Sequence, residues 1–453
     1  MKIKYFVLFL FIFSEVYFFE SKSNFQIISS VCFYLYLIVL AVINFRKSVE
    51  YYFYFSLLTM GAWSYISPLN IPQNFWGLKL QGISINVLFS FFLLIGGIIL
   101  KKGKFLINKP SIFFLVYIFY SAIIGYLYVL KGQNYLDNFI SDLFVLLPSI
   151  SYIFLFSFFS RNELLGIFKN CYIFSIISII LSWILDKNFI YGFSYKYLLM
   201  NGMSFILPYA FLFISGIFNK KLQIINGILI LIFIYLGKLF ISGKLIVLLT
   251  CAIFVSLLVN YSKGAILFIT SIIISYFIFF NTEFFGNFSE DSLMAHKLNQ
   301  IFDVFSIFDI EFLASSPTSM GNIIAEGVTI FNHYFSNWKF FIFGKGFGGG
   351  IPDLFGYLTP LSNPTQGYKE IDASRNNFFR MHLPIYEIFI KTGLIGLSCF
   401  FGLIFYIIKS NSKFTFLIFS LLFLVVFNTK EMLLLTILLF NLLEYKRTDF
   451  ESK

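Results

Sequence analysis

Charged residues are scarce in this chain: they make up 12% of its 453 residues, whereas soluble domains have about 25%. Hydrophobic residues make up 59% of the chain and are gathered into long blocks. This composition excludes a disordered chain and a small secreted domain held by disulfides. A helix needs about 20 mostly apolar residues to cross a bilayer, and many blocks reach that length. The sequence therefore predicts an integral membrane protein.

Cysteine is also sparse, and its placement excludes a disulfide framework. Each cysteine falls in a different apolar block, and no CxxC pair occurs. We expect all of them to act as small apolar residues in helices. No HExxH or paired His/Cys spacing indicates zinc, so we expect no metal site. The four cysteines are Cys32, Cys171, Cys251 and Cys399.

The net charge of +11 does not indicate nucleic-acid binding, because the basic residues lie at the ends of apolar blocks and not on one face or tail. When the N-terminus is placed inside and the spans alternate, most short connections with basic residues fall on the cytoplasmic side, as membrane orientation requires. We therefore expect a multi-pass protein of the cytoplasmic membrane with both termini in the cytoplasm. The first block, which contains Glu15, has no cleavage site after it and is expected to be a retained helix.

The fold class predicted is an all-α polytopic membrane protein with about 12–14 transmembrane helices, since the blocks do not alternate as strands of a β-barrel would. About fourteen helices are expected, at 4–19, 26–44, 51–66, 82–100, 111–130, 139–159, 167–185, 199–218, 222–240, 243–260, 264–281, 385–408, 414–428 and 430–444.

One long stretch contains no convincing span and divides the chain into three parts. Residues 1–281 hold about eleven helices, 282–384 form a large periplasmic or extracellular loop, and 385–453 hold about three helices and a cytoplasmic tail. The loop is rich in aromatic residues, so we expect short, partly amphipathic helices lying on the membrane surface. It contains all three histidines of the chain, His296, His333 and His382.

Two glycine-containing segments resemble nucleotide-binding motifs but lack their context. The segment Gly344 to Gly349 fits GxGxxG, yet no βαβ unit is expected around it. The segment from Gly237 to Leu245 has the wrong spacing for a P-loop and lacks its Ser or Thr. We therefore expect no nucleotide cofactor.

The segment from Asp372 to Glu387 is the best candidate for chemistry. Histidine exchanges a proton near neutral pH, and arginine forms bidentate bonds with phosphate oxygens. Here His382 stands beside Arg375 and Arg380, just before a predicted helix. The pattern favours proton abstraction next to a bound phosphate, although a solvated loop end explains the same residues.

Three further charged residues have both a functional and a structural interpretation. Lys238 and Lys244 flank a short outer turn, where they could serve a site or extend to the lipid headgroups. Glu387 could orient the imidazole of His382 or pair with Lys391 one helical turn later, and we favour the second.

With these residues in view, the chain resembles the O-antigen polymerase and O-antigen ligase superfamily. The resemblance rests on the late outer loop, on a Gly-x-Gly-x-Gly stretch formed by Gly344, Gly346 and Gly348, and on His382 eleven residues before Gly393-Leu-Ile-Gly396. Ser242-Gly243-Lys244 is a weaker match. The chain departs from the family at Leu383, where Asn is frequent, and at Lys244, where Arg is usual.

The resemblance implies an inverting glycosyl transfer on the outer face of the membrane, with no metal or other cofactor. The donor would be an oligosaccharide on undecaprenyl pyrophosphate, held in membrane lipid, and a polysaccharide chain-length regulator is a possible partner. By analogy His382 would be the base, and Arg375, Arg380, Lys244 and Lys238 would bind the pyrophosphate. Glu387 and the three glycines would support the site.

Two alternatives remain open. A ligase would transfer the same donor to lipid A-core, and a capsule or exopolysaccharide enzyme is equally compatible with the pattern. The other alternative is a flippase or similar transporter without enzymatic activity. Transporters usually contain two related halves with a site at mid-membrane, and no internal repeat is visible in this sequence. We favour the polymerase.

Overall fold

The computed structural model describes residues 2–20, 25–59, 75–80, 83–105, 107–185, 319–358, 370–379, 381 and 383–410. Within these residues the regular structure is almost entirely helical. Four of the described helical segments are long and apolar enough to cross a membrane: Phe25–Ile43, Lys109–Leu130, Leu136–Phe158 and Ile385–Leu403. This agrees with the all-α membrane class. The helices predicted within 199–281 and 414–444 lie outside the described residues.

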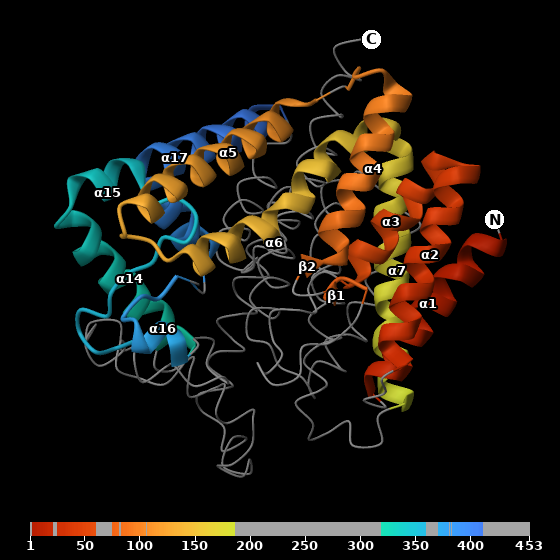
Figure 1. Cartoon of the computed structure of the whole chain (residues 1–453), viewed down its shortest axis with the longest axis horizontal. Coiled ribbons are helices and arrows are strands. Elements are labelled where there is room, and N and C mark those ends of the chain that lie inside the picture. The colour runs from red at the N-terminus through yellow and green to blue at the C-terminus, as the bar shows by residue number, and fades with distance from the viewer. Residues whose placement is uncertain are drawn as a thin grey trace, which may run out of the picture.

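The N-terminal helices form a bundle with an aromatic core. It contains α1 (Lys2–Glu20), α2 (Phe25–Ile43), α3 (Phe45–Thr59), α4 (Ile85–Lys101) and α7 (Arg161–Leu185), with the second half of α6 (Leu136–Leu155) packed against α4 (Figure 1). Phe11, Phe33, Phe55 and Phe75 pack ring against ring at its centre. Every residue of α3 from Tyr51 onward is buried, so α3 is the central helix of this bundle.

Helix α3 begins earlier than the sequence predicts. The predicted start at residue 51 is wrong, because the charged stretch before it is helical from Phe45. Asn44 separates α2 from α3, and its side-chain oxygen accepts the backbone N–H of Lys47 at 3.1 Å. This is the geometry of an N-cap, and the capping bond stabilises the start of the helix although its first turn is charged.

A short antiparallel pair precedes α4, in place of the predicted first turn of that helix. Strand β1 (Lys79–Leu80) pairs with β2 (Ile83–Ser84), so α4 starts at Ile85 and not at residue 82. The helix ends as expected: Lys102 and Gly103 have φ of 49° and 72°, and their N–H groups bond back to Ile99 and Ile98. Such a left-handed ending satisfies carbonyls that the helix leaves free.

A second group of helices lies at the other side of the molecule. It contains α5 (Lys109–Leu130), α14 (Ser319–Phe335), α15 (Trp338–Phe343), α16 (Glu370–Ser374) and α17 (Pro384–Ser410), and α17 runs alongside α5 (Figure 1). Helix α6 connects the two groups and ends in the 3₁₀ turn η2 (Phe156–Phe158). Helices α14, α15 and α16 fall in the stretch where the sequence predicts a loop of short helices.

The two faces of α5 have different surroundings. Its exposed face carries apolar side chains at Ile112, Val116, Phe119 and Ile123, as a lipid-facing surface would. Its buried face carries Phe114, Ile118, Ser121 and Gly125 at the same spacing of three and four residues. The small residues on the buried face allow the loop after α15 to approach the helix backbone.

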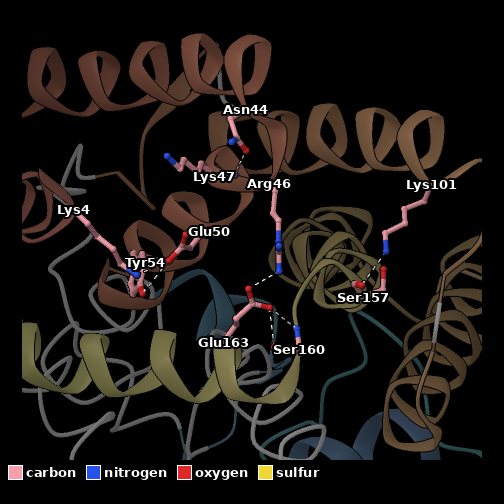
Figure 2. A network of polar contacts seen from close by, with 10 residues as sticks. All are labelled: Lys4, Asn44, Arg46, Lys47, Glu50, Tyr54, Lys101, Ser157, Ser160 and Glu163. Carbon is pink, nitrogen blue, oxygen red and sulfur yellow. Dashed lines mark hydrogen bonds and ion pairs between the residues drawn. The ribbon is translucent and has the colours of Figure 1, made fainter. Parts of the chain in front are cut away.

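Charged side chains gather at one end of the N-terminal bundle (Figure 2). Lys4 of α1 pairs with Glu50 of α3, Arg46 pairs with Glu163 of α7, and Lys101 donates to the Ser157 carbonyl. Lys4, Arg46 and Lys101 are basic residues at the ends of apolar blocks, and the alternation of spans predicts all three on the cytoplasmic side. The structure brings these three residues to a common end of the bundle.

Candidate functional site

The glycine-rich loop that follows α15 lies between α5, α6 and α17, in the left half of Figure 1. Lys345 N donates to the Ile390 carbonyl of α17 at 2.7 Å, and Phe347 N donates to the Ser121 carbonyl of α5 at 2.7 Å. The Asn134 side chain, between α5 and α6, donates to the carbonyls of Lys345 and Phe347. Hydrogen bonds to α5, to α17 and to the α5–α6 connection therefore hold the backbone of the loop.

Glycine is required in this loop by backbone packing. Gly346 has a φ of 68°, in the left-handed region that favours glycine. A Cβ atom at Gly346 would collide with the backbone of Gly125 in α5. The opposing glycines let the loop and the helix touch backbone to backbone. The Gly-x-Gly-x-Gly stretch is thus a close-packing device here, and a helix precedes it in place of the strand that a dinucleotide site needs.

The second glycine motif, Gly393-Leu-Ile-Gly396, interrupts α17 where the loop binds to it. Gly393 has φ 61° and ψ −159°, which interrupts the helix. A helical carbonyl normally accepts the N–H four residues later, so an interruption at Gly393 leaves nearby carbonyls free. The Ile390 carbonyl accepts Lys345 N and the Tyr334 hydroxyl, and the Lys391 carbonyl accepts Gly346 N at 3.0 Å. The two glycine motifs therefore form one structural unit.

Replacing Gly393 with alanine tests this unit. The backbone conformation at Gly393 is almost restricted to glycine, at a cost of about 1–3 kcal/mol for other residues, and a Cβ would meet the Ile342 carbonyl. We expect Gly393→Ala to lower the thermal midpoint of the detergent-purified protein. Gly402→Ala in the same helix is the matched control, because nothing lies within 4 Å of its added Cβ. Equal midpoints for the two variants would contradict the role assigned to Gly393.

A buried ionic cluster joins the loop to both helices. Lys391 Nζ lies 3.0 Å from Glu387 Oε2 and 3.5 Å from Asp142 Oδ2 of α6. The same Asp142 oxygen accepts the backbone N–H of Gly348 at 2.8 Å. Lys391 and Asp142 are fully buried, so their charges depend on one another. The predicted pairing of Glu387 with Lys391 is confirmed, and Asp142 is an additional member of the cluster that was not predicted from the sequence.

The residues on either side of His382 are fixed by the same cluster. Glu387 Oε1 accepts the backbone N–H of Met381 at 3.4 Å, and the Leu383 carbonyl accepts the backbone N–H of Glu387 at 3.2 Å. Met381 and Leu383 are buried. His382 itself lies outside the described residues, as do Arg380, Lys238, Lys244 and His296. The described neighbours nevertheless hold the chain on both sides of His382.

Arg375 lies against the connection between α5 and α6. Its Nη1 atom is 2.6 Å from Asp137 Oδ2, and its guanidinium group lies 4.6 Å from the ring centroid of Tyr135. The sequence predicts a phosphate-binding role for Arg375, and in the structure part of its hydrogen-bonding capacity is used by Asp137. Asn134, which precedes Tyr135 and Asp137 in the chain, donates to the Lys345 and Phe347 carbonyls of the glycine-rich loop.

Lys345 and His333 both have lowered pKa values. Burial lowers the pKa of Lys345 to about 8. Burial and the charge of Lys345 lower the pKa of His333 to about 4, so His333 is neutral at pH 7. Lys345 stands inside the glycine motif, and no signal in the sequence separates it from the other lysines. Asp142 could have been noticed as a single carboxylate within an apolar block.

Comparison of the chain with protein-family models, with curated proteins and with solved structures finds no match. The assignment of function therefore depends on the residues and the geometry described above.

Proposed function

We propose that this protein polymerises oligosaccharide repeat units carried on undecaprenyl pyrophosphate, on the outer face of the cytoplasmic membrane. The observation that carries the proposal is the joining of the two glycine motifs by backbone hydrogen bonds, next to the anchored residues Met381 and Leu383. Those motifs are the ones on which the resemblance to the polymerase and ligase superfamily rests. Their contact gives a physical reason for them to occur together.

The proposed topology has about 12–14 transmembrane helices, cytoplasmic termini and a large outer loop that carries the site. The connection between α5 and α6 and the glycine-rich loop are in contact through Asn134, and the charge pattern assigns both to the outer side. This agreement supports an external site at the mouth of α17. A lipid-linked donor reaches such a site from within the bilayer.

The proposed reaction forms one glycosidic bond and breaks one bond to phosphate. The hydroxyl oxygen of the acceptor repeat unit attacks the anomeric carbon of the donor glycan, while His382 takes the hydroxyl proton. The bond between the anomeric carbon and the phosphate oxygen breaks on the opposite side, so the anomeric configuration is inverted. Undecaprenyl pyrophosphate leaves with the bonding electron pair.

The basic residues have the role of stabilising the leaving group. Charge develops on the departing pyrophosphate, and fixed cations placed there lower the barrier. Arg375 and Arg380 come from the same segment as His382, whereas Lys238 and Lys244 flank the short outer turn that the sequence predicts before the last two helices preceding the loop. Glu387 supports the segment around His382, because its carboxylate accepts the backbone N–H of Met381 and pairs with Lys391.

A deletion strain tests the proposed function. We expect a strain without this protein to produce surface glycan with no more than one repeat unit, and the wild-type chain to restore a ladder on a glycan gel. Bare lipid A-core together with accumulated lipid-linked polymer would identify a ligase. Accumulation of single repeat units on the cytoplasmic side would identify a transporter and overturn the proposal.

A further inference from the structure

Lys345 is a buried cation without a carboxylate partner among the described residues. Only 6% of it is exposed. Its ammonium group donates to the Gly350 carbonyl at 2.8 Å and lies 4.8 Å from the ring centroid of Phe340. No described carboxylate forms an ion pair with it, in contrast to Lys391, which contacts two carboxylates. An ammonium group has three N–H donors, so Lys345 retains donors for a further acceptor.

A second buried donor lies against the same glycine. Asn377 is 9% exposed, and its side-chain Nδ2 has no hydrogen-bond partner. A Cβ added to Gly350 would meet Oδ1 and Cγ of the Asn377 side chain, so the Asn377 amide group, which carries the unpaired Nδ2, lies directly against Gly350. Lys345 and Asn377 therefore border Gly350 together. An unsatisfied buried donor is rare in proteins and calls for an explanation.

Asn377 belongs to the segment that carries the proposed chemistry, and Lys345 belongs to the glycine-rich loop. Asn377 lies two residues after Arg375 and five before His382. Its neighbour Phe378 exchanges two backbone hydrogen bonds of 2.9 Å with Ile351, which directly follows Gly350. The glycine-rich loop and the segment leading to His382 are thus tied together at Gly350.

The electrostatics of this place favour an anion. Burying a charge without an opposite charge costs free energy. For Lys345, burial disfavours the charged form and lowers the pKa to about 8. Among the described residues, the charge of Lys345 also lowers the pKa of His333. His333 is therefore neutral at pH 7 and supplies no negative charge. A bound anion would neutralise Lys345 and accept the free N–H of Asn377. Phosphate oxygens accept several such charge-assisted bonds at once.

We propose that Lys345 and Asn377 hold a phosphate group of the polyprenyl-pyrophosphate donor. The inference rests on the proposed function for the identity of the lipid, whereas the recognised chemistry is a phosphoryl anion. Lys345 approaches the anion from the glycine-rich loop, and Asn377 approaches it from the His382 segment. The site also gives a reason for the backbone hydrogen bonds between the loop and α17. They make the loop rigid, and a rigid loop keeps the Lys345 ammonium group in place for the leaving group.

Isothermal titration of the full-length protein in detergent tests the site. The probes are farnesyl pyrophosphate, inorganic pyrophosphate and uncharged farnesol. We expect wild type to bind both pyrophosphates, and Lys345→Met and Asn377→Leu to bind them about tenfold or more weakly, as loss of a hydrogen bond to a charged group predicts. The matched control is Lys339→Met, an exposed lysine of α15, which should bind like wild type.

Folding of the variants is measured separately by the thermal midpoint without ligand. Lys345→Met should have a midpoint equal to or above that of wild type, because an apolar side chain replaces an unneutralised buried charge. Weaker binding with an unchanged midpoint then reports the loss of the site. Asn377→Leu provides a second, uncharged variant for the same comparison.

The outcomes separate this inference from the proposed function, because binding is measured without glycan transfer. Wild-type affinity in both variants, or no binding of either pyrophosphate by wild type, would overturn the site. Binding of inorganic pyrophosphate but not farnesyl pyrophosphate would indicate a free anion and overturn the donor assignment. Loss of binding in Lys345→Met would support the site even if the glycan ladder assigned another activity to the protein.

Discussion

Alanine in place of His382 is expected to abolish elongation of the surface glycan. A positioned general base contributes about 10²–10⁴-fold to a rate, so a variant without it should form too little polymer to give a ladder. The expected gel of the complemented deletion strain shows core with a single repeat unit. The amount of protein in the membrane should stay close to wild type, because the neighbours Met381 and Leu383 keep their own contacts.

His333→Gln is the matched control for His382→Ala. His333 is the described histidine of the same loop, and it lies on α14 against the rings of Tyr334 and Phe340. We expect His333→Gln to retain the ladder. If His382→Ala also restores a normal ladder at matched protein level, His382 is not the base, and the transporter alternative becomes the better explanation.

Breaking the buried ionic cluster should have the largest effect on stability. Removal of one partner from a buried pair costs about 3–5 kcal/mol, because the remaining charge is left without compensation. We expect Lys391→Met to lower the thermal midpoint strongly, since Asp142 and Glu387 both contact the Lys391 ammonium group. Asp142→Asn should do the same and also weaken the hydrogen bond from Gly348.

A double-mutant cycle separates this cluster from independent packing effects. The two losses should be strongly non-additive in Lys391→Met/Asp142→Asn, because the second change removes the charge that the first leaves unpaired. Lys339→Met is the control for removal of an exposed lysine. Additive losses would mean that Lys391 and Asp142 do not interact in the folded protein.

The apolar blocks predict most described helices to within a few residues, because a long apolar block has few alternatives to a helix in a membrane. The start of α3 could not be predicted in this way. It depends on the side chain of Asn44, which makes a charged stretch helical from Phe45 onward. The strand pair before α4 is only two residues long on each side, too short for an alternation pattern to be recognised.

The candidate site was predictable where its contacts are local in sequence. Glu387 and Lys391 lie one helical turn apart, and their pairing follows from that spacing. Asp142 and Asn134 are more than two hundred residues away from the loop that they contact, and only the tertiary fold brings them there. The same holds for Asp137, which partners Arg375.

The glycine motifs were also predictable from the sequence only in part. Their spacing was visible in the sequence, but their contact depends on the interruption at Gly393, which frees the carbonyls that the loop N–H groups use. For Lys345 the sequence offered only a lysine between two glycines. Its burial and its place beside Asn377 are consequences of how the loop folds onto α17.

The most direct test of the account is elongation by the purified protein in proteoliposomes. The substrate is the undecaprenyl-pyrophosphate-linked repeat unit, and the buffer contains a chelator of divalent metals. We predict longer lipid-linked glycans, release of one undecaprenyl pyrophosphate for each new glycosidic bond, and loss of both products in His382→Ala. Unchanged repeat units that instead cross the bilayer in a protein-dependent manner would contradict the account.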